Sequence, residues 1–376
     1  MARIAYFDNS GTTAVAEEVL AEMLPFFTEH YGNPSSIHSM GDAAAKAMSA
    51  ARKRVAAALN CRPSEIVFTS GGTEADNLAI LGTVPRSGRK KVITSAVEHS
   101  AVLEPCGTLM AKGYEVIILP ADREGRISAD ALSEAIDKDT ALVSVMAANN
   151  VIGTIQPIAE LAEIAHEHGA LFHTDAVQAF TRTDLDAVRD GMDMLSLSGH
   201  KIHGPKGIGA LYVRNGVELD PTMLGGGQEG GRRSSTENIP GMVGLGKAAE
   251  LAMSTMKEDI KRMTGIRKKI IDGILNVKGA YLNGPRDGRL CNNAHLGFDG
   301  IKGMDLVLRL SRMGVMASTA SACSAGSTEP SHVLTAIGRT PAESMSSLRI
   351  SLSRYTTQEE ADLLLDAVPE AIASLR

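Results

Sequence analysis

Residues 192–201 read Met-Asp-Met-Leu-Ser-Leu-Ser-Gly-His-Lys, an apolar strand that runs directly into a glycine turn and a lysine. Gly204-Pro205-Lys206-Gly207 follows, and a second apolar run occupies residues 208–213. A lysine on such a turn between two core strands is partly removed from water, which lowers its pKa and makes its amine a usable nucleophile. The alternative is a solvated turn lysine, the commoner environment of this residue type. Lys201 is therefore a candidate Schiff-base lysine.

On both sides of this stretch, short β-rich runs alternate with amphipathic helical runs. Residues 66–68, 92–94 and 141–146 have the composition of strands, and residues 158–166 that of a helix. This alternation predicts an α/β fold with parallel strands and helices on both faces of the sheet. Ligands of such sheets bind outside the carboxyl ends of the strands.

The length of 376 residues exceeds the size at which one hydrophobic core stops growing. After Gly225-Gly226-Gly227 the pattern changes to one long helical stretch, about 242–275, and then a smaller α+β region. We therefore expect a large domain at residues 13–255. The small domain is expected at 256–376, with residues 1–12 packed against it. The last helix should begin at Thr357, whose spacing to Glu360 is that of a capping box.

Composition excludes several classes of function. A net charge of −6 gives no basic face for nucleic acid. No apolar run reaches membrane-spanning length and the first residues do not have the pattern of a signal peptide, so we expect a cytoplasmic protein that does not bind membranes. Four widely spaced cysteines form no Cys-x-x-Cys pair, which argues against a structural zinc site or a disulfide framework.

Two turns after expected strands carry residues suited to a phosphorylated ring. Ser70-Gly71-Gly72-Thr73 lies between a strand and a helix start, where backbone N–H groups and the Thr73 hydroxyl can hold a phosphate. Asp175 ends the strand at 170–174, with Gln178 three residues later, and its carboxylate can pair with a protonated pyridine nitrogen. An ordinary helix cap is the alternative at both turns.

Other polar residues occupy comparable positions. His99 follows a strand and could stack on a cofactor ring or carry protons. Asn149-Asn150 closes a strand in the same layer, and Arg349 interrupts a core strand where it could bind a carboxylate. Thr236 lies in a glycine-bounded loop that could reach a phosphate of a neighbouring subunit. Alternatives are a structural histidine, a plain loop and a structural ion pair.

Cys323 lies in a run of small polar residues, 318–328, that has little to bury. We expect this segment to be mobile and exposed. Most free cysteines are buried and inert, but one on a wet loop is a candidate nucleophile and redox-sensitive thiol. Cys61, Cys106 and Cys291 lie in apolar or turn contexts and are expected to be bystanders.

Together these motifs resemble the NifS/IscS-type cysteine desulfurases, which are class V aminotransferase-like, fold-type I enzymes dependent on pyridoxal 5′-phosphate (PLP). The similarity runs nearly end to end, through eight ordered motifs: Tyr6–Thr13, Gly32–His38, Gly72–Glu74, Glu98-His99, Asn149-Asn150, Asp175–Gln178, Ser198–Lys201 and the segment from Cys323 to Leu334. Two departures are Val151, where the family commonly has an acidic residue, and Gly11, where it usually has alanine. Eight motifs in order are far more specific than any one alone.

The resemblance implies a large domain with a mainly parallel seven-stranded sheet and a small α+β domain that carries the Cys323 loop. It implies that Lys201 forms the Schiff base with PLP and moves the substrate's α-proton, while Asp175 pairs with the pyridine nitrogen. The other implied roles are as follows: Gln178 at the phenolic oxygen; His99 on the ring and near the Cys323 thiol; Gly72, Thr73, Ser198, His200 and a second subunit's Thr236 at the phosphate; Asn150 and Arg349 at the substrate carboxylate.

The implied reaction removes sulfur from L-cysteine, giving L-alanine and a persulfide on Cys323. The sulfur would pass to an iron–sulfur scaffold protein or a tRNA-thiolation protein, and the enzyme would be a homodimer. No resident metal is implied, although Cys323 could be a transient iron–sulfur ligand. The alternatives are a selenocysteine lyase or another class V aminotransferase, and a non-catalytic sulfur-carrier or scaffold subunit with the same fold.

Overall fold

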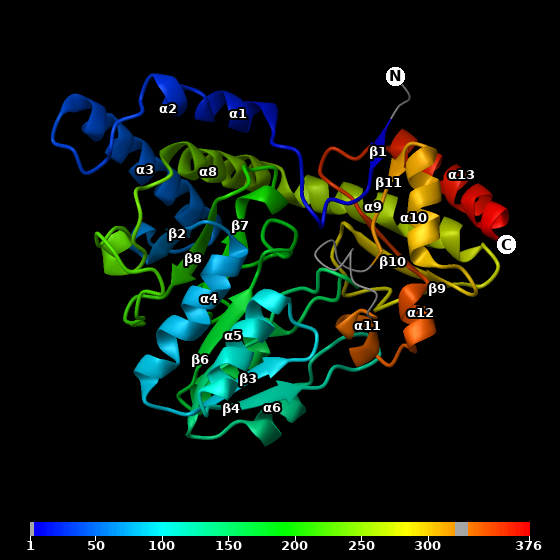
Figure 1. Cartoon of the computed structure of the whole chain (residues 1–376), viewed down its shortest axis with the longest axis horizontal. Helices are drawn as coiled ribbons and strands as arrows, with labels where there is room; N and C mark the ends of the chain where they lie inside the picture. Colours follow the sequence, from blue (N-terminus) through cyan, green and yellow to red (C-terminus); the bar gives the residue numbers. More distant parts are fainter. Residues whose placement is uncertain (1–3, 320–329) are drawn as a thin grey trace.

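The computed structural model describes residues 4–319 and 330–376, and a seven-stranded sheet is its central element (Figure 1). Across the sheet the strands are β2 (Ile66–Thr69), β8 (Gly209–Val213), β7 (Met194–Ser198), β6 (Leu171–Asp175), β5 (Thr140–Ser144), β3 (Lys91–Ser95) and β4 (Glu115–Leu119). Strand β8 is antiparallel to both its neighbours, and the remaining pairs are parallel. The predicted α/β class with a mainly parallel sheet is confirmed.

Helices cover both faces of this sheet because successive side chains of a strand point to opposite sides. Phe68 and Leu195 belong to one buried apolar cluster, whereas their neighbours Val67 and Met194 belong to another. The second cluster packs under α4 (Gly72–Thr83) and α5 (Ser100–Ala111). The first includes residues of α3 (Ser39–Ala58), α7 (Ile158–Glu167) and α8 (Ile239–Ser254). Shorter helices are α1 (Glu17–Met23), α2 (Pro25–Thr28) and α6 (Ala129–Ala135), with 3₁₀ turns η1 (Pro63–Glu65), η2 (Pro85–Ser87), η3 (Gly199–Lys201) and η4 (Glu229–Gly231).

A second region has its own apolar cluster, formed by residues from Met263 to Ile372 together with Ala5 and Phe7. Its antiparallel sheet has the order β12 (Ser347–Ser351), β10 (Asn293–Phe298), β9 (Ala280–Leu282). A parallel pair joins β1 (Ala5–Tyr6) to β11 (Val315–Met316). The helices are α9 (Met256–Leu275), α10 (Gly303–Arg312), α11 (His332–Ala336), α12 (Pro341–Met345) and α13 (Gln358–Leu375). The domain boundaries at 12/13 and 255/256 stay a prediction.

The long helical stretch predicted at about 242–275 is present, but two helices and not one occupy it. Helices α8 and α9 meet at Thr255, whose φ of −124° and ψ of 10° are not helical. The Thr255 hydroxyl donates to the Asp259 carboxylate at 2.6 Å, in the first turn of α9. The break lets α8 pack with the large sheet while α9 packs with the second cluster (Figure 1).

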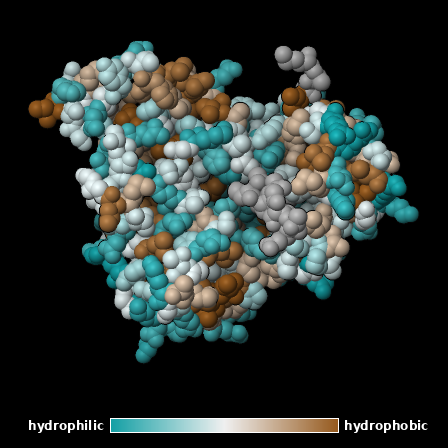
Figure 2. Space-filling model, in the orientation of Figure 1, coloured by the Kyte–Doolittle hydropathy of each residue, from teal (hydrophilic) through white to brown (hydrophobic). Residues whose placement is uncertain are grey.

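Hydrophilic and hydrophobic residues are interspersed on the face seen in Figure 2. Within residues 4–319 and 330–376, no helix is long and apolar enough to cross a membrane.

Candidate active site

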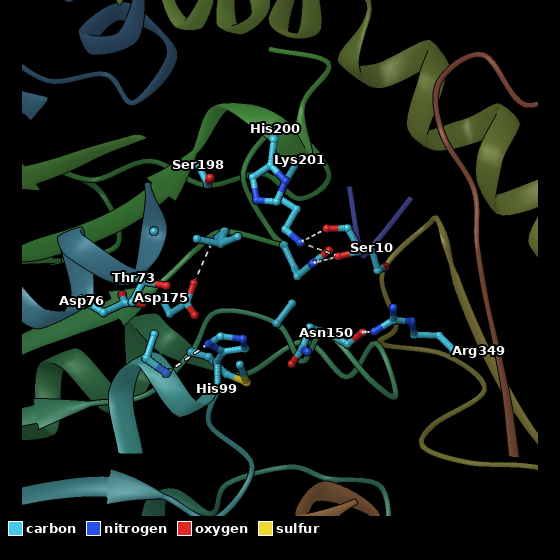
Figure 3. A pocket seen from close by; sticks show the side chains of 17 residues that line it. Ser10, Thr73, Asp76, His99, Asn150, Asp175, Ser198, His200, Lys201 and Arg349 are labelled. Atoms are coloured by element: carbon cyan, nitrogen blue, oxygen red, sulfur yellow. Dashed lines mark hydrogen bonds between the residues drawn. The ribbon is translucent and has the colours of Figure 1, made fainter. Parts of the chain in front are cut away.

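A cavity of about 170 Å³ opens where β6 and β7 end, and the predicted site residues gather there (Figure 3). Ten of the twelve line it: Gly72, Thr73, His99, Asn150, Asp175, Gln178, Ser198, His200, Lys201 and Arg349. They come from different elements: most end or follow a strand or begin a helix, and Arg349 lies within β12 of the second region. The cavity therefore forms at the edge of the sheet that the sequence predicted.

Lys201 is a half-buried wall residue of this cavity, so the solvated-turn alternative is wrong. It ends the 3₁₀ turn η3, directly after β7. Its Nζ donates to the carbonyl oxygens of Ser10 at 2.6 Å and Gly11 at 2.7 Å. The turn is tight: a Cβ on Gly204 would lie 2.9 Å from the Gly199 oxygen. Glycine is required for this close approach, which fixes the lysine in place.

The start of α4 supplies an anion site at one side of the cavity. The first intrahelical bond runs from the Ala75 N–H to the Gly71 carbonyl, which leaves the N–H groups of Gly72 and Thr73 outside the helix's own bonding. A Cβ on Gly72 would lie 2.6 Å from Val177 Cγ2, so a larger residue would not fit. Helix N-termini with free N–H groups favour phosphate.

Ser198 and His200 line the same cavity from β7 and η3. Burial, reinforced by the charges of Lys201 and Lys206, lowers the pKa of His200 to about 4. Its Nδ1 lies 3.1 Å from the Thr12 hydroxyl. His200 is therefore neutral at pH 7 and can hold an anion through a hydrogen bond.

Asp175 ends β6 with its side chain almost completely buried. Its only side-chain hydrogen bond recorded among the described residues comes from the Val177 N–H at 2.9 Å. Burial raises the pKa of this carboxyl, while the charges of His99 and Lys201 act in the opposite direction. Residues 177–182 form turns and not a helix, so the helix-cap alternative is wrong here.

Gln178 lies beside the lysine in this arrangement. Its Nε2 donates to the Ser10 carbonyl at 3.0 Å, the same oxygen that accepts from Lys201. The Gln178 amide and the Lys201 amine are thus held at one point of the cavity wall.

His99 combines the two roles that the sequence left open. Its Nδ1 accepts from the Ala101 N–H at 3.1 Å and so caps α5, while the ring lines the cavity. Burial lowers the pKa of this imidazole, with the Asp175 charge opposing the effect. With Nδ1 accepting, the neutral ring carries its proton on Nε2, so it can stack on a cofactor ring and donate a hydrogen bond.

Asn149 and Asn150 have different roles. Asn149 is fully buried: its amide donates to the Val97 carbonyl at 2.8 Å, and its Oδ1 accepts from the N–H groups of Val151 and Ile152, both at 2.9 Å. Asn149 therefore fastens the loop, as the plain-loop alternative predicted. Asn150 lines the cavity.

Arg349 reaches the cavity from β12 of the second region and is 1% exposed. It forms an ion pair with Asp8 at 2.8 Å and donates to the Asn150 carbonyl at 3.3 Å. The ion-pair alternative is thus confirmed, and it coexists with a position on the cavity wall.

Two predicted residues lie elsewhere. Thr236 is exposed and does not line the cavity. Cys323 lies outside the described residues. Ser318, at the start of its segment, is buried and exchanges backbone hydrogen bonds of 3.2 and 2.7 Å with Arg349, so the expectation of a mobile, exposed segment is wrong at that end. Burial raises the pKa of the remaining thiols, to about 12 for Cys61 and Cys106 and to about 11 for Cys291. These three cysteines are protonated at neutral pH and are poor nucleophiles.

Sequence reasoning missed Ser10, Gly11 and Asp76 as cavity residues. Ser10 and Gly11 belong to an N-terminal motif whose backbone carbonyls, not side chains, contact Lys201. Asp76 lies four residues after Gly72, which places both on one face of α4. That helical spacing was a usable signal.

Comparison with known proteins identifies the class to which this site belongs. The model of the aminotransferase class-V family matches residues 5–364, and the chain belongs to this family. A cysteine desulfurase IscS of Methanosarcina thermophila is 49% identical over 376 residues, covering 100% of this chain and 93% of the relative. The corresponding protein of Dictyoglomus turgidum is 46% identical, with 100% and 96% covered.

Solved structures agree with the sequence relatives. A NifS-like protein superposes with a TM-score of 0.93 at 40% identity, covering 99% of this chain and 100% of that one. SspA, solved in complex with cysteine, superposes with a TM-score of 0.83 at 40% identity, covering 94% and 100%. The predicted kinship with NifS/IscS-type enzymes is confirmed, and the family depends on PLP.

Proposed function

We propose that the protein is a PLP-dependent cysteine desulfurase, which removes sulfur from L-cysteine, releases L-alanine and leaves a persulfide on Cys323. The observation that carries this proposal is the cavity itself. It gathers a lysine amine, a buried carboxylate, an imidazole and the N-terminus of α4 within one enclosure. The full-length kinship with cysteine desulfurases supports the choice of reaction.

The residues present fit PLP. The free N–H groups of Gly72 and Thr73, with Ser198 and His200, suit its phosphate. Asp175 has accepting capacity left beyond its one bond to Val177, which suits a protonated ring nitrogen. PLP, when bound through Lys201, supplies an electron sink for the pair left at the substrate's α-carbon.

The chain's own residues then bind the substrate and move its protons. Asn150 and Arg349 adjoin one another on the cavity wall and would hold the carboxylate of cysteine. The Lys201 amine would take the α-proton and return a proton to the carbon skeleton. Gln178 and the Ser10 and Gly11 carbonyls would orient that amine.

The sulfur step belongs to Cys323. Its thiolate attacks the substrate sulfur, so that an S–S bond forms as the C–S bond breaks. The electron pair of the C–S bond stays with the carbon skeleton, which takes up a proton and leaves as alanine. His99 would assist this ionisation: with Nδ1 held by the Ala101 N–H, its Nε2–H would donate to the thiolate, and the thiol proton would leave to solvent. The persulfide would then pass to an acceptor.

The partners and location are part of the proposal. Thr236 is exposed and lies outside this chain's cavity; in a homodimer with shared sites it would reach the phosphate of the second copy. An iron–sulfur scaffold or another sulfur acceptor would receive the persulfide, and the name IscS of the relatives supports that choice. A cytoplasmic location remains a prediction. The relatives do not favour a selenocysteine lyase, another aminotransferase or a non-catalytic subunit.

The proposal is tested by comparing Cys323→Ala with Cys61→Ala, a matched change at a half-buried bystander. With L-cysteine and a reductant, the unmodified protein should release alanine and sulfide in equal amounts. Cys323→Ala should keep the cofactor's visible absorbance and lose alanine release by about a hundredfold or more. Cys61→Ala should stay near the unmodified rate. Normal sulfide release by Cys323→Ala contradicts the mechanism, and a keto-acid product identifies an aminotransferase.

A further inference from the structure

Asp76 is a buried carboxyl in the cavity to which the proposed mechanism assigns no task. It lies in α4, one helical turn after Gly72, and is 1% exposed. Its Oδ1 has no hydrogen-bond partner among the described residues. Figure 3 draws its side chain on the same side of the cavity as Asp175 and Thr73. Most buried polar atoms of proteins are hydrogen-bonded, so an unpartnered carboxyl oxygen in a cavity calls for an explanation.

A chain of buried polar side chains lies behind Asp76. The His173 ring on β6 spans the hydroxyls of two neighbouring strands: its Nδ1 is 2.8 Å from Ser144 Oγ and its Nε2 is 3.0 Å from Ser196 Oγ. The same Nε2 lies 3.5 Å from Asp76 Oδ1. Burial lowers the pKa of His173 to about 3, so the ring is neutral and contributes no charge to balance a carboxylate.

The charges around the two carboxyls differ. Burial and the negative charges of Asp175 and, to a lesser extent, Glu98 raise the pKa of Asp76 well above its usual range, although a hydrogen bond from Ser196 acts in the opposite direction. Asp175 is also raised by burial, but His99 and Lys201 hold its pKa down. Two neighbouring carboxyls in unequal surroundings divide into one acid and one carboxylate. Asp76 is the acid of this pair.

We propose that Asp76 is a positioning residue of the cofactor site: it keeps the one proton of its pair with Asp175, so that a single negative charge faces the ring-nitrogen end of the cavity. The neutral Asp76 carboxyl joins the Asp175 end of the cavity to the buried polar side chains around His173, and so keeps the two aspartates in place. This inference rests on the proposed function only in taking PLP as the cofactor.

The test measures PLP binding by the apoprotein, without cysteine, and the pH titration of the bound cofactor's visible band. Asp76→Asn is a neutral isostere and should bind PLP within about twofold of the unmodified protein at neutral pH. Asp76→Ala removes the polar group and should weaken binding about tenfold. Glu104→Gln, an equal charge change at an exposed position of α5, is the control and should have no effect.

The pH titration separates this role from a merely structural one. The titratable groups near Asp76 are His173 and Asp175 on β6 and Glu98 before α5, all present in every variant. At and below neutral pH the unmodified protein and Asp76→Asn should titrate alike. At alkaline pH Asp76 ionises in the unmodified protein, which then has a second negative charge that Asp76→Asn lacks. Its bound cofactor, followed by the visible band, should therefore stay protonated to a higher pH.

Three results would overturn the proposal: Asp76→Asn binding as weakly as Asp76→Ala, Asp76→Ala binding as tightly as the unmodified protein, or titrations that coincide at every pH. If Asp76→Ala does not fold, Asp76→Asn and its titration still decide. Loss of desulfurase activity alone does not bear on the inference, since these measurements contain no cysteine. The two proposals can therefore fail separately.

Discussion

Two buried aspartates on neighbouring strands of the large sheet have opposite surroundings. Asp193 precedes β7 and is 0% exposed; its carboxylate accepts from Arg214 at 2.6 Å, from the Phe172 N–H at 2.7 Å, and lies 2.9 Å from His166 Nε2. Asp175, at the other end of β6, is 6% exposed and accepts from the Val177 N–H alone among its recorded bonds.

This difference distinguishes a buried carboxylate that stabilises the sheet from one that takes part in function. The polar contacts of Asp193 compensate its burial and join the start of β7 to β6. Asp175 has one recorded hydrogen bond, Asp76 Oδ1 has none among the described residues, and both carboxyls line the cavity. A buried carboxyl whose partners are missing marks the place where a ligand supplies them.

Replacing Lys201, whose amine lies at the cavity end of the sheet, should have the largest effect on activity. Lys201→Ala should lower alanine release from cysteine about a thousandfold or more, because the Schiff-base nucleophile and proton carrier are removed. Lys201→Arg keeps a cation but no nucleophile and should be equally inactive. Coupled alanine and sulfide assays measure both. Activity of either variant within tenfold of the unmodified protein would contradict the role of this amine.

The two aspartates themselves give the sharpest test of the comparison. Asp175→Asn should lower kcat about a hundredfold, since the ring nitrogen loses its ionic partner, with apoprotein stability nearly unchanged. Asp193→Asn should lower the free energy of unfolding by about 2 kcal/mol, since hydrogen bonds to a charged group are lost. Denaturant unfolding and steady-state kinetics would be read for both. The comparison is wrong if the two variants exchange these effects.

A smaller effect is expected at the carboxylate site. Arg349→Lys should raise the KM for cysteine about tenfold, with a lesser change in kcat, because lysine cannot form a bidentate pair with a carboxylate. Asp8→Asn, which removes the ion pair at 2.8 Å but leaves the guanidinium, is the matched control and should change KM less. Equal KM changes in the two variants would assign Arg349 to structure alone.

The smallest expected effect is on stability at acid pH, and it comes from His173. The pKa of His173 falls from 6.5 to about 3 on burial, so between those values the unfolded chain binds a proton that the native chain does not. His173 therefore favours the native state above pH 6.5 relative to acid, and stability should fall as the pH drops. Replacing it, as in His173→Gln, should reduce this slope by up to about 1.4 kcal/mol per pH unit. Apoprotein unfolding at several pH values measures it, and an unchanged slope would contradict the account.

Much of the fold and site was predictable because it depends on local chemistry. The capping box at Thr357 and Glu360 was predicted from spacing and is present, with bonds of 3.2 and 2.8 Å. Lys201 and Asp175 could be placed because strand ends of a parallel sheet converge.

The remainder depended on contacts between distant segments. Ser10 and Gly11 act through carbonyls, which no side-chain pattern reveals. The end of α8 at Thr255 and the unpartnered state of Asp76 follow from how segments pack, and local sequence does not specify them.

The most direct test of the central claim is the mass of the Cys323 peptide after anaerobic incubation of the PLP-loaded protein with L-cysteine. The account predicts a gain of one sulfur atom on Cys323, matched by one equivalent of alanine. Lys201→Ala, treated in the same way, should show neither. An unmodified Cys323 in a protein that nevertheless releases alanine would contradict the claim.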